Sequence, residues 1–247
     1  QPILGFVIIK NDRNAESIPE ETLMDFKAQT FDIDPTTPNR VSRKLSFLCK
    51  IFAFALLQMS FNISAEVAEQ QASTLAGKPL FSSPPSEGVL TKLTIARNAY
   101  IASPNDPDLL IWWGRRMAYT GNFLGAIDIF TQGIEKFPDD PRFYRHRGHR
   151  YISVREFKNA SNTLEVAAKL ISGTRNEIEP DGLPNAMGIP ISSLHGNTWY
   201  HLGLAYYLQH DWSNALRAYT HGFNAARNPD NQVSTTHWRY MILRRMG

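Results

Sequence analysis

The segment between residues 141 and 153 concentrates side chains that could bind a charged ligand. It contains no acidic residue and four arginines: Arg142, Arg145, Arg147 and Arg150. An arginine guanidinium presents a planar fork of donors that matches the two oxygens of a carboxylate. The spacing therefore indicates recognition of an anionic peptide or chain end. The alternative is a solvated basic face whose charge is balanced by neighbouring acids: Glu135, Asp139, Asp140 and Glu156.

Two histidines of this segment have a spacing that could bind a metal ion. His146 and His149 are three residues apart, so on a helix they would lie on one face. A third ligand does not follow from the sequence, and the flanking arginines would oppose a cation. The chain also has no glycine-rich phosphate loop, no Gly-x-Ser-x-Gly and no His-Glu-x-x-His sequence. We therefore expect no metal, no cofactor and no enzymatic activity.

The composition is that of an ordinary globular protein. The chain has 247 residues, of which 43% are hydrophobic and 20% are charged. Its net charge of +3 is too small to indicate a nucleic-acid partner. Because Cys49 is the one cysteine, a disulfide within the chain is excluded.

Landmark residues recur along the chain with a period of 34 residues. Three pairs share this separation: Pro107 and Pro141, Gly114 and Gly148, Ala126 and Ala160. The aspartate before each proline can cap a helix that accepts proline in its first turn. The small residues would let two helices approach closely, and a third unit repeats them as Gly203 and Ala215. Such units must stack, because one unit cannot bury its apolar face alone.

This pattern resembles the tetratricopeptide repeat, or TPR. The resemblance covers residues 89–247 and implies an all-α, right-handed solenoid of antiparallel helical hairpins. Repeats are expected near 107–140, 141–171 and 196–229, with partial units at both ends. Arg147 departs from the family's pattern, because a large apolar residue is usual at its position.

The resemblance also implies where a ligand binds, because TPR arrays bind partners mostly in a concave groove lined by the first helix of each hairpin. Counting along these helices gives six groove-facing candidates: Arg115, Arg142, Arg145, His149, Tyr200 and Tyr207. The predicted function is a scaffold that binds a protein or peptide, with an acidic segment as the expected ligand. Two alternatives remain open. One is an enzyme with a pocket under the insertion described next, and the other is a structural subunit of an envelope assembly.

An insertion of residues 172–195 interrupts the period between the second and third units. Its three prolines and three glycines prevent it from continuing a helix. It is either a surface excursion or a lid over the groove. A lid would bury its apolar side chains: Leu183, Met187, Ile189 and Ile191. Its acids would then face the basic segment: Glu177, Glu179 and Asp181.

The residues before the array have the features of an export signal. Residues 41–65 combine a basic start, a short apolar run and a small-residue exit that ends at Ala65. The apolar run is shorter than the ~20 residues that span a bilayer, so no membrane span is expected after cleavage. A buried helix is the alternative. We expect residues 1–40 to be an untranslated or disordered extension and residues 66–88 to be a linker.

The location expected for the mature chain is periplasmic or secreted, because residues 41–65 have the pattern of a signal peptide. Two phrases within the array support export, since they resemble those of secreted bacterial TPR proteins of unassigned function. They are found at residues 179–185 and 199–208. This resemblance names no activity.

Overall fold

The computed structural model describes residues 69–180, 184–226 and 228–247 of the chain. The first 68 residues lie outside this part. They include the extension predicted over 1–40 and the signal peptide predicted over 41–65, and both remain predictions.

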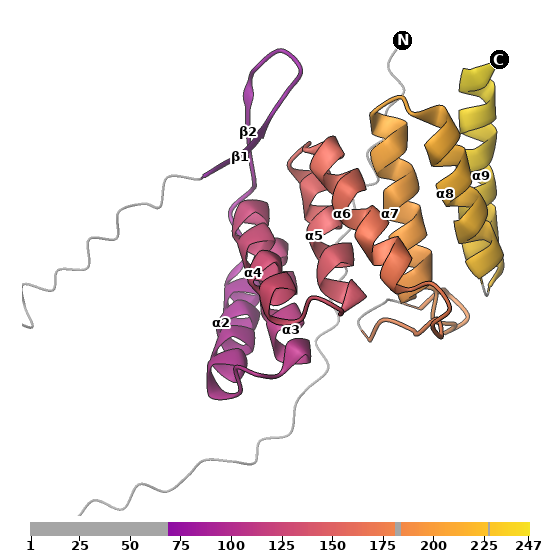
Figure 1. The fold of residues 1–247 in the computed structure, drawn as a ribbon. Coiled ribbons are helices and arrows are strands. Elements are labelled where there is room, and N and C mark those ends of the chain that lie inside the picture. The colour runs from indigo at the N-terminus through magenta and orange to yellow at the C-terminus, as the bar shows by residue number, and fades with distance from the viewer. Residues whose placement is uncertain (1–68, 181–183, 227) are drawn as a thin grey trace, which may run out of the picture. The chain divides into compact units, whose positions relative to one another are not determined.

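Helices make up most of the described chain and follow one another as antiparallel hairpins (Figure 1). In chain order, the eight described helices are α2 (Glu87–Ala102), α3 (Pro107–Tyr119), α4 (Phe123–Lys136), α5 (Pro141–Ser153), α6 (Phe157–Leu170), α7 (Leu194–Leu208), α8 (Trp212–Ala225) and α9 (Pro229–Met246). Each helix packs against the next one in sequence. In addition, α3 contacts α5, α5 contacts α7 and α7 contacts α9, so these four form one layer. We call α3, α5, α7 and α9 the A helices, and the others the B helices.

The first two full hairpins begin where the sequence pattern predicts. Asp106 caps α3 by accepting hydrogen bonds from backbone N–H groups of the first turn, and Pro107 follows it. Asp140 caps α5 in the same way, and Pro141 follows it. Proline costs no helical hydrogen bond at this place, because the N–H groups of a first turn have no partner within the helix. The predicted helix starts are therefore confirmed.

Small residues allow the two helices of each hairpin to approach closely. A Cβ atom added at Gly148 would lie 2.5 Å from Leu164 Cγ. At Gly203 the corresponding distance, to Tyr219 Cε2, is 2.6 Å, and Gly114 holds the equivalent place in the first hairpin. The alanines of the facing B helices are fully buried: Ala126, Ala160 and Ala215. A larger side chain at any of these positions would therefore force the hairpin apart.

A two-stranded hairpin precedes the helices, within the region where a linker is predicted over residues 66–88. Strands β1 (Gln70–Ser73) and β2 (Pro79–Phe81) pair in antiparallel fashion. The side-chain oxygen of Gln71 accepts hydrogen bonds from the first two backbone N–H groups of α4, at 2.7 and 3.1 Å, and so caps that helix. The linker prediction is wrong for these strands. Sequence patterns miss this contact because its two ends lie 52 residues apart.

One helix stands at each place where a partial unit is predicted, α2 at one end of the array and α9 at the other. The side chain of Ile242 in α9 is fully buried, together with Tyr219 of α8. The ring of Trp238 stacks on the ring of Tyr219 with a centroid distance of 5.5 Å. α9 is therefore packed on the third hairpin as a continuation of the array.

Candidate binding site on the face of the A helices

The insertion predicted over residues 172–195 occupies the connection between Leu170, where α6 ends, and Leu194, where α7 begins. Two antiparallel bridges hold its described arms together: Ile178 with Ser193, and Pro184 with Pro190. The backbone N–H of Glu179 donates to the carbonyl of Ser192 at 3.0 Å. This pairing holds Glu179 against the exposed side of the A-helix layer, which we call the A-helix face.

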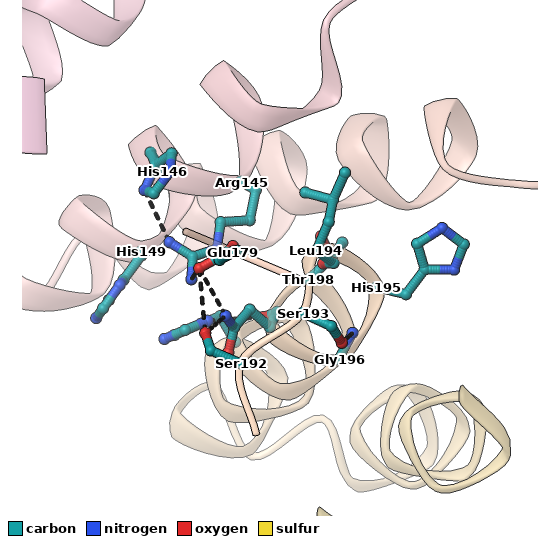
Figure 2. A network of polar contacts seen from close by, with 12 residues as sticks. Arg145, His146, His149, Glu179, Ser192, Ser193, Leu194, His195, Gly196 and Thr198 are labelled. Atoms are coloured by element: carbon teal, nitrogen blue, oxygen red, sulfur yellow. Dashed lines mark hydrogen bonds and ion pairs between the residues drawn. The ribbon is translucent and has the colours of Figure 1, made fainter. Parts of the chain in front are cut away.

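A buried ion pair joins the insertion to α5 (Figure 2). Arg145 Nη2 lies 2.8 Å from Glu179 Oε2, and the two side chains are only 7% and 9% exposed. The same carboxylate oxygen accepts hydrogen bonds from Asn197 Nδ2 at 2.9 Å and from Ser192 Oγ at 3.3 Å. Burial lowers the pKa of Arg145, and the charge of Glu179 opposes that effect. The prediction that acids of the insertion face the basic segment is therefore confirmed for Glu179.

Three histidines pack beside this ion pair. Arg145 Nη1 donates to His146 Nδ1 at 2.7 Å. Arg150 Nη2 donates to His149 Nδ1 at 2.6 Å, and the His149 ring lies 3.9 Å from the His201 ring, centroid to centroid. Because arginine can only donate, each Nδ1 must accept, and the proton of the neutral ring lies on Nε2.

The surroundings of these histidines keep them uncharged. Burial, followed by the charges of neighbouring arginines, lowers the pKa of His146 and His149 well below the ordinary value. For His201, burial and then the charge of Arg145 lower the pKa to about 3. Burial also lowers the pKa of Arg150, to about 10. The charge of the cluster is therefore carried by its arginines.

Two cavities open on the A-helix face, and the insertion separates them. The first has a volume of about 120 Å³ and lies between α3, α5 and the insertion, where Arg115, His146 and Glu179 line it. The second has a volume of about 510 Å³ and lies between α7, α9 and the insertion, where Ser192 and Tyr200 line it. Since Glu179 lines one cavity and Ser192 the other, their contact divides the face into two parts.

The predicted groove arginines are brought together, but two of them are matched by acids of the chain itself. Arg142 lies 2.6 Å from Asp108 and 2.7 Å from Asp140, and its hydrogen bond to Asp140 raises its pKa. Arg145 is buried under the insertion. Arg115 lines the first cavity, and its guanidinium lies 4.9 Å from the centre of the Trp112 ring.

The other predicted groove residues have different surroundings. His149 packs on His201, inside the basic cluster. Tyr200 lines the second cavity, and its hydroxyl accepts a hydrogen bond from Trp238 Nε1 at 3.3 Å. Tyr207 packs against Trp212 and Trp238, with both centroid distances 5.1 Å. Tyr207 therefore contributes to helix packing, and the structure gives it no place in either cavity lining described above.

Sequence reasoning missed three members of this site: Arg150, Ser192 and His201. The sequence indicated Arg150 only as a member of the basic segment. In the structure, its hydrogen bond to His149 Nδ1 also sets the tautomer of that histidine. His201 carries a signal that could have been used. It lies four residues after Asn197, and its Nδ1 lies 2.7 Å from the Asn197 carbonyl, so the two residues share the A-helix face.

The insertion is held mainly by polar contacts and not by the apolar side chains predicted for a lid. Met187 is 76% exposed and Ile189 is 39% exposed, so the prediction is wrong for these two. Ile191 lines the second cavity. Leu183 and Asp181 lie outside the described residues. The physical reason is that hydrogen bonds from helix side chains, such as the one from Asn197 to Glu179, fix the loop without burial of its tip.

The described residues offer neither a metal-binding cluster nor a membrane-spanning helix. In that part of the chain, no three His, Cys, Asp or Glu side chains are grouped so that they could hold a metal ion. His146 and His149 each share Nδ1 with an arginine donor. None of the described helices combines the length and the apolar character needed to cross a bilayer.

α9 leaves several large apolar side chains more than half exposed: Val233, Tyr240 and Leu243. Exposed apolar faces of this kind are typical of protein contact surfaces. The alternative of a structural subunit predicts an exposed apolar face at the end of the array, where α9 lies.

Comparisons with known proteins find similar folds. No protein-family model matches the chain, and no curated protein matches it. The first TPR domain of Spaghetti (RPAP3), solved with an HSP90 peptide, is 16% identical, with 57% of this chain and 92% of that chain covered and a TM-score of 0.45. YrrB, a TPR protein described as having an unusual peptide-binding site, is 16% identical, with coverages of 62% and 66% and a TM-score of 0.47. MamA from Desulfovibrio magneticus RS-1 is 14% identical, with coverages of 64% and 85% and a TM-score of 0.44.

The chain's own geometry defines the class of its fold. The described helices form antiparallel hairpins, and successive A helices contact one another in a single layer. With the 34-residue period of the first two hairpins, this is an all-α, right-handed solenoid of the TPR type. The predicted fold class is therefore confirmed.

Proposed function

We propose that the chain is a non-enzymatic scaffold that binds a peptide segment of a partner protein on its A-helix face. The observation that carries this proposal is that the two cavities open on one face and are lined by all four A helices together. A peptide laid across these helices reaches both cavities. TPR-type arrays offer such extended surfaces because each repeat contributes one helix to the same side.

The charges of the A-helix face favour an acidic partner segment. Arg115, Arg145 and Arg150 lie close enough for their charges to act on one another, and Glu179 is the carboxylate that acts on Arg145. Guanidinium groups that are partly removed from water attract a carboxylate more strongly than exposed ones do. A partner with acidic side chains would bring further carboxylates to these guanidinium groups.

The two cavities beside the insertion differ in size. The first measures about 120 Å³ and the second about 510 Å³. Sites for small-molecule substrates usually measure roughly 300 to 1,000 Å³. The first cavity therefore fits a single side chain of a peptide better than a whole substrate, and the second, which lies within that range, is where the enzyme alternative would place its pocket.

Selection from a library of random displayed peptides tests the proposed function. We expect the full chain to enrich acidic peptides, and we expect Arg115→Ala to weaken the best of them by roughly tenfold, which corresponds to about 1.4 kcal/mol. Ser234→Trp, which places a large ring in the second cavity, is expected to have a similar effect. Lys169→Ala on the B helix α6 is the matched control and should stay within about twofold of the wild type. Selected peptides that bind the Arg115 and Ser234 variants as tightly as the wild type would refute the A-helix face as the binding site.

We further propose that the chain is exported, periplasmic or secreted, on the basis of the signal-like pattern in residues 41–65. The expected result is a mature protein that begins at Glu66, after cleavage behind Ala65. Sequencing of the mature protein's N-terminus by mass spectrometry measures this directly. A mature chain that retains residues 1–40 would contradict the export signal.

A further inference from the structure

The side chain of Glu179 occupies a site that is built by the helices. Arg145 belongs to α5 and Asn197 to α7, and both donate to Glu179 Oε2, at 2.8 and 2.9 Å. Asn197 Nδ2 also donates to Ser192 Oγ at 2.7 Å. This hydrogen bond orients Asn197 and Ser192, which both donate to Glu179, relative to each other. Two of the three donors therefore stand on helices, whereas Ser192 and the carboxylate itself belong to the connecting segment.

The fit between this site and Glu179 is incomplete. The three hydrogen bonds that Glu179 accepts all end on one oxygen, Oε2. Arg145 is 6% exposed, yet its Nε has no hydrogen-bond partner among the described residues. A buried donor without a partner costs roughly 1–3 kcal/mol. A carboxylate that approached the guanidinium side-on would use both of its oxygens and would satisfy Nε as well as Nη2.

We propose that Arg145, Asn197 and Ser192 form a carboxylate-binding site for an acidic side chain of the partner, and that Glu179 fills this site when the partner is absent. The inference rests on the proposed function, because it names the part of the A-helix face that an acidic segment occupies. Glu179 also lines the first cavity, so its side chain has a place to turn into while the bridge between Ile178 and Ser193 stays formed.

Occupation of the site by Glu179 stabilises the fold. A guanidinium that is buried without a partner is strongly destabilising, so an empty site would weaken the fold. The internal carboxylate prevents this, and the partner then exchanges one carboxylate for another. The exchange reduces the apparent affinity by the fraction of molecules in which the site is open. The chain therefore binds acidic partners more weakly than its donors alone would allow.

Glu179→Gln in the full chain tests the inference, with a fluorescein-labelled hexaglutamate peptide as the probe and fluorescence anisotropy as the measurement. The variant keeps the shape of the side chain and removes the competing charge. We expect at least about a tenfold gain in affinity, which corresponds to about 1.4 kcal/mol. Glu177→Gln is the matched control, because Glu177 lies two residues away in the same segment and also lines the first cavity, but its side chain is exposed. It removes the same charge from the same segment, and a gain below about twofold is expected from weakened surface electrostatics.

Two further variants separate competition at the site from other effects. Glu179→Asp keeps the charge but shortens the side chain. Its affinity for the probe should therefore lie between the affinities of the wild type and Glu179→Gln. Adding Arg145→Gln to Glu179→Gln should abolish the gain. An unchanged affinity of Glu179→Gln, or an equal gain in Glu177→Gln, would overturn the inference. The proposed function would survive that result if Arg115→Ala and Ser234→Trp still weakened the selected peptides.

Discussion

Acidification from pH 7.5 to pH 5 is expected to remove about 2 kcal/mol from the free energy of unfolding through His201 alone, and the burial of His146 and His149 adds to this loss. Burial and neighbouring arginines lower the pKa values of His146, His149 and His201 in the folded chain. A base with a folded-state pKa below its unfolded value of about 6.5 binds fewer protons when folded. Below pH 6.5, protonation therefore favours the unfolded chain. The loss grows as the pH falls toward the folded-state pKa, which is about 3 for His201.

Urea unfolding followed by circular dichroism at several pH values measures this loss. His201→Gln removes the group whose folded-state pKa is about 3, so the loss between pH 7.5 and pH 5 should fall by about 2 kcal/mol. His237→Gln is the matched control, because the His237 side chain is exposed, and it should leave the loss unchanged. A free energy of unfolding that is the same at pH 7.5 and pH 5 would show that the cluster is not neutral in the folded chain.

Arg145→Ala is expected to reduce the free energy of unfolding by about 3–5 kcal/mol at neutral pH, because it leaves the Glu179 carboxylate buried without a cation. Both side chains of this ion pair are less than 10% exposed, so water cannot replace the lost guanidinium without opening the insertion. The truncation also removes the donor to His146 Nδ1. Urea unfolding gives the loss directly.

Two companion variants show whether the cost comes from the stranded charge. Arg142→Ala on the same helix is the matched control. Its partners are Asp108 and Asp140, its side chain is 39% exposed, and a loss of less than about 1 kcal/mol is expected. The double variant Arg145→Met, Glu179→Gln removes both charges and should recover much of the stability. If Arg145→Ala costs no more than Arg142→Ala, the ion pair does not anchor the insertion.

The repeat architecture could be predicted from the sequence because its signals are local. Asp106 and Pro107, or Asp140 and Pro141, act within one helical turn, so their meaning is contained in a few adjacent residues. The period of 34 residues then orders the hairpins, since each one must cover its neighbour's apolar face. The pairing of Gly148 with Leu164 follows from the same register.

The candidate site could be predicted only in part, because its contacts join segments that are distant in sequence. The excess of arginines in 141–153 correctly indicated a basic surface, and the acids of the insertion were expected to face it. Which acid does so depends on the bridge between Ile178 and Ser193, and this pairing has no sequence pattern of its own. For Tyr207 the prediction from spacing was misleading. Its place on α7 suggested a groove-facing side chain, but its ring packs against Trp238 of α9.

By itself, the sequence determined that the chain forms TPR-type helical hairpins with a basic A helix at 141–153. Capping, helix periodicity and close approach at glycine are properties of neighbouring residues. They can therefore be predicted without knowledge of the rest of the chain. Only the tertiary structure decided that Arg145 is buried against Glu179 and that Gln71 caps a helix 52 residues away. These contacts depend on the final positions of the insertion and of the β1–β2 hairpin. Those positions are set by the burial and hydrogen bonding of the whole array.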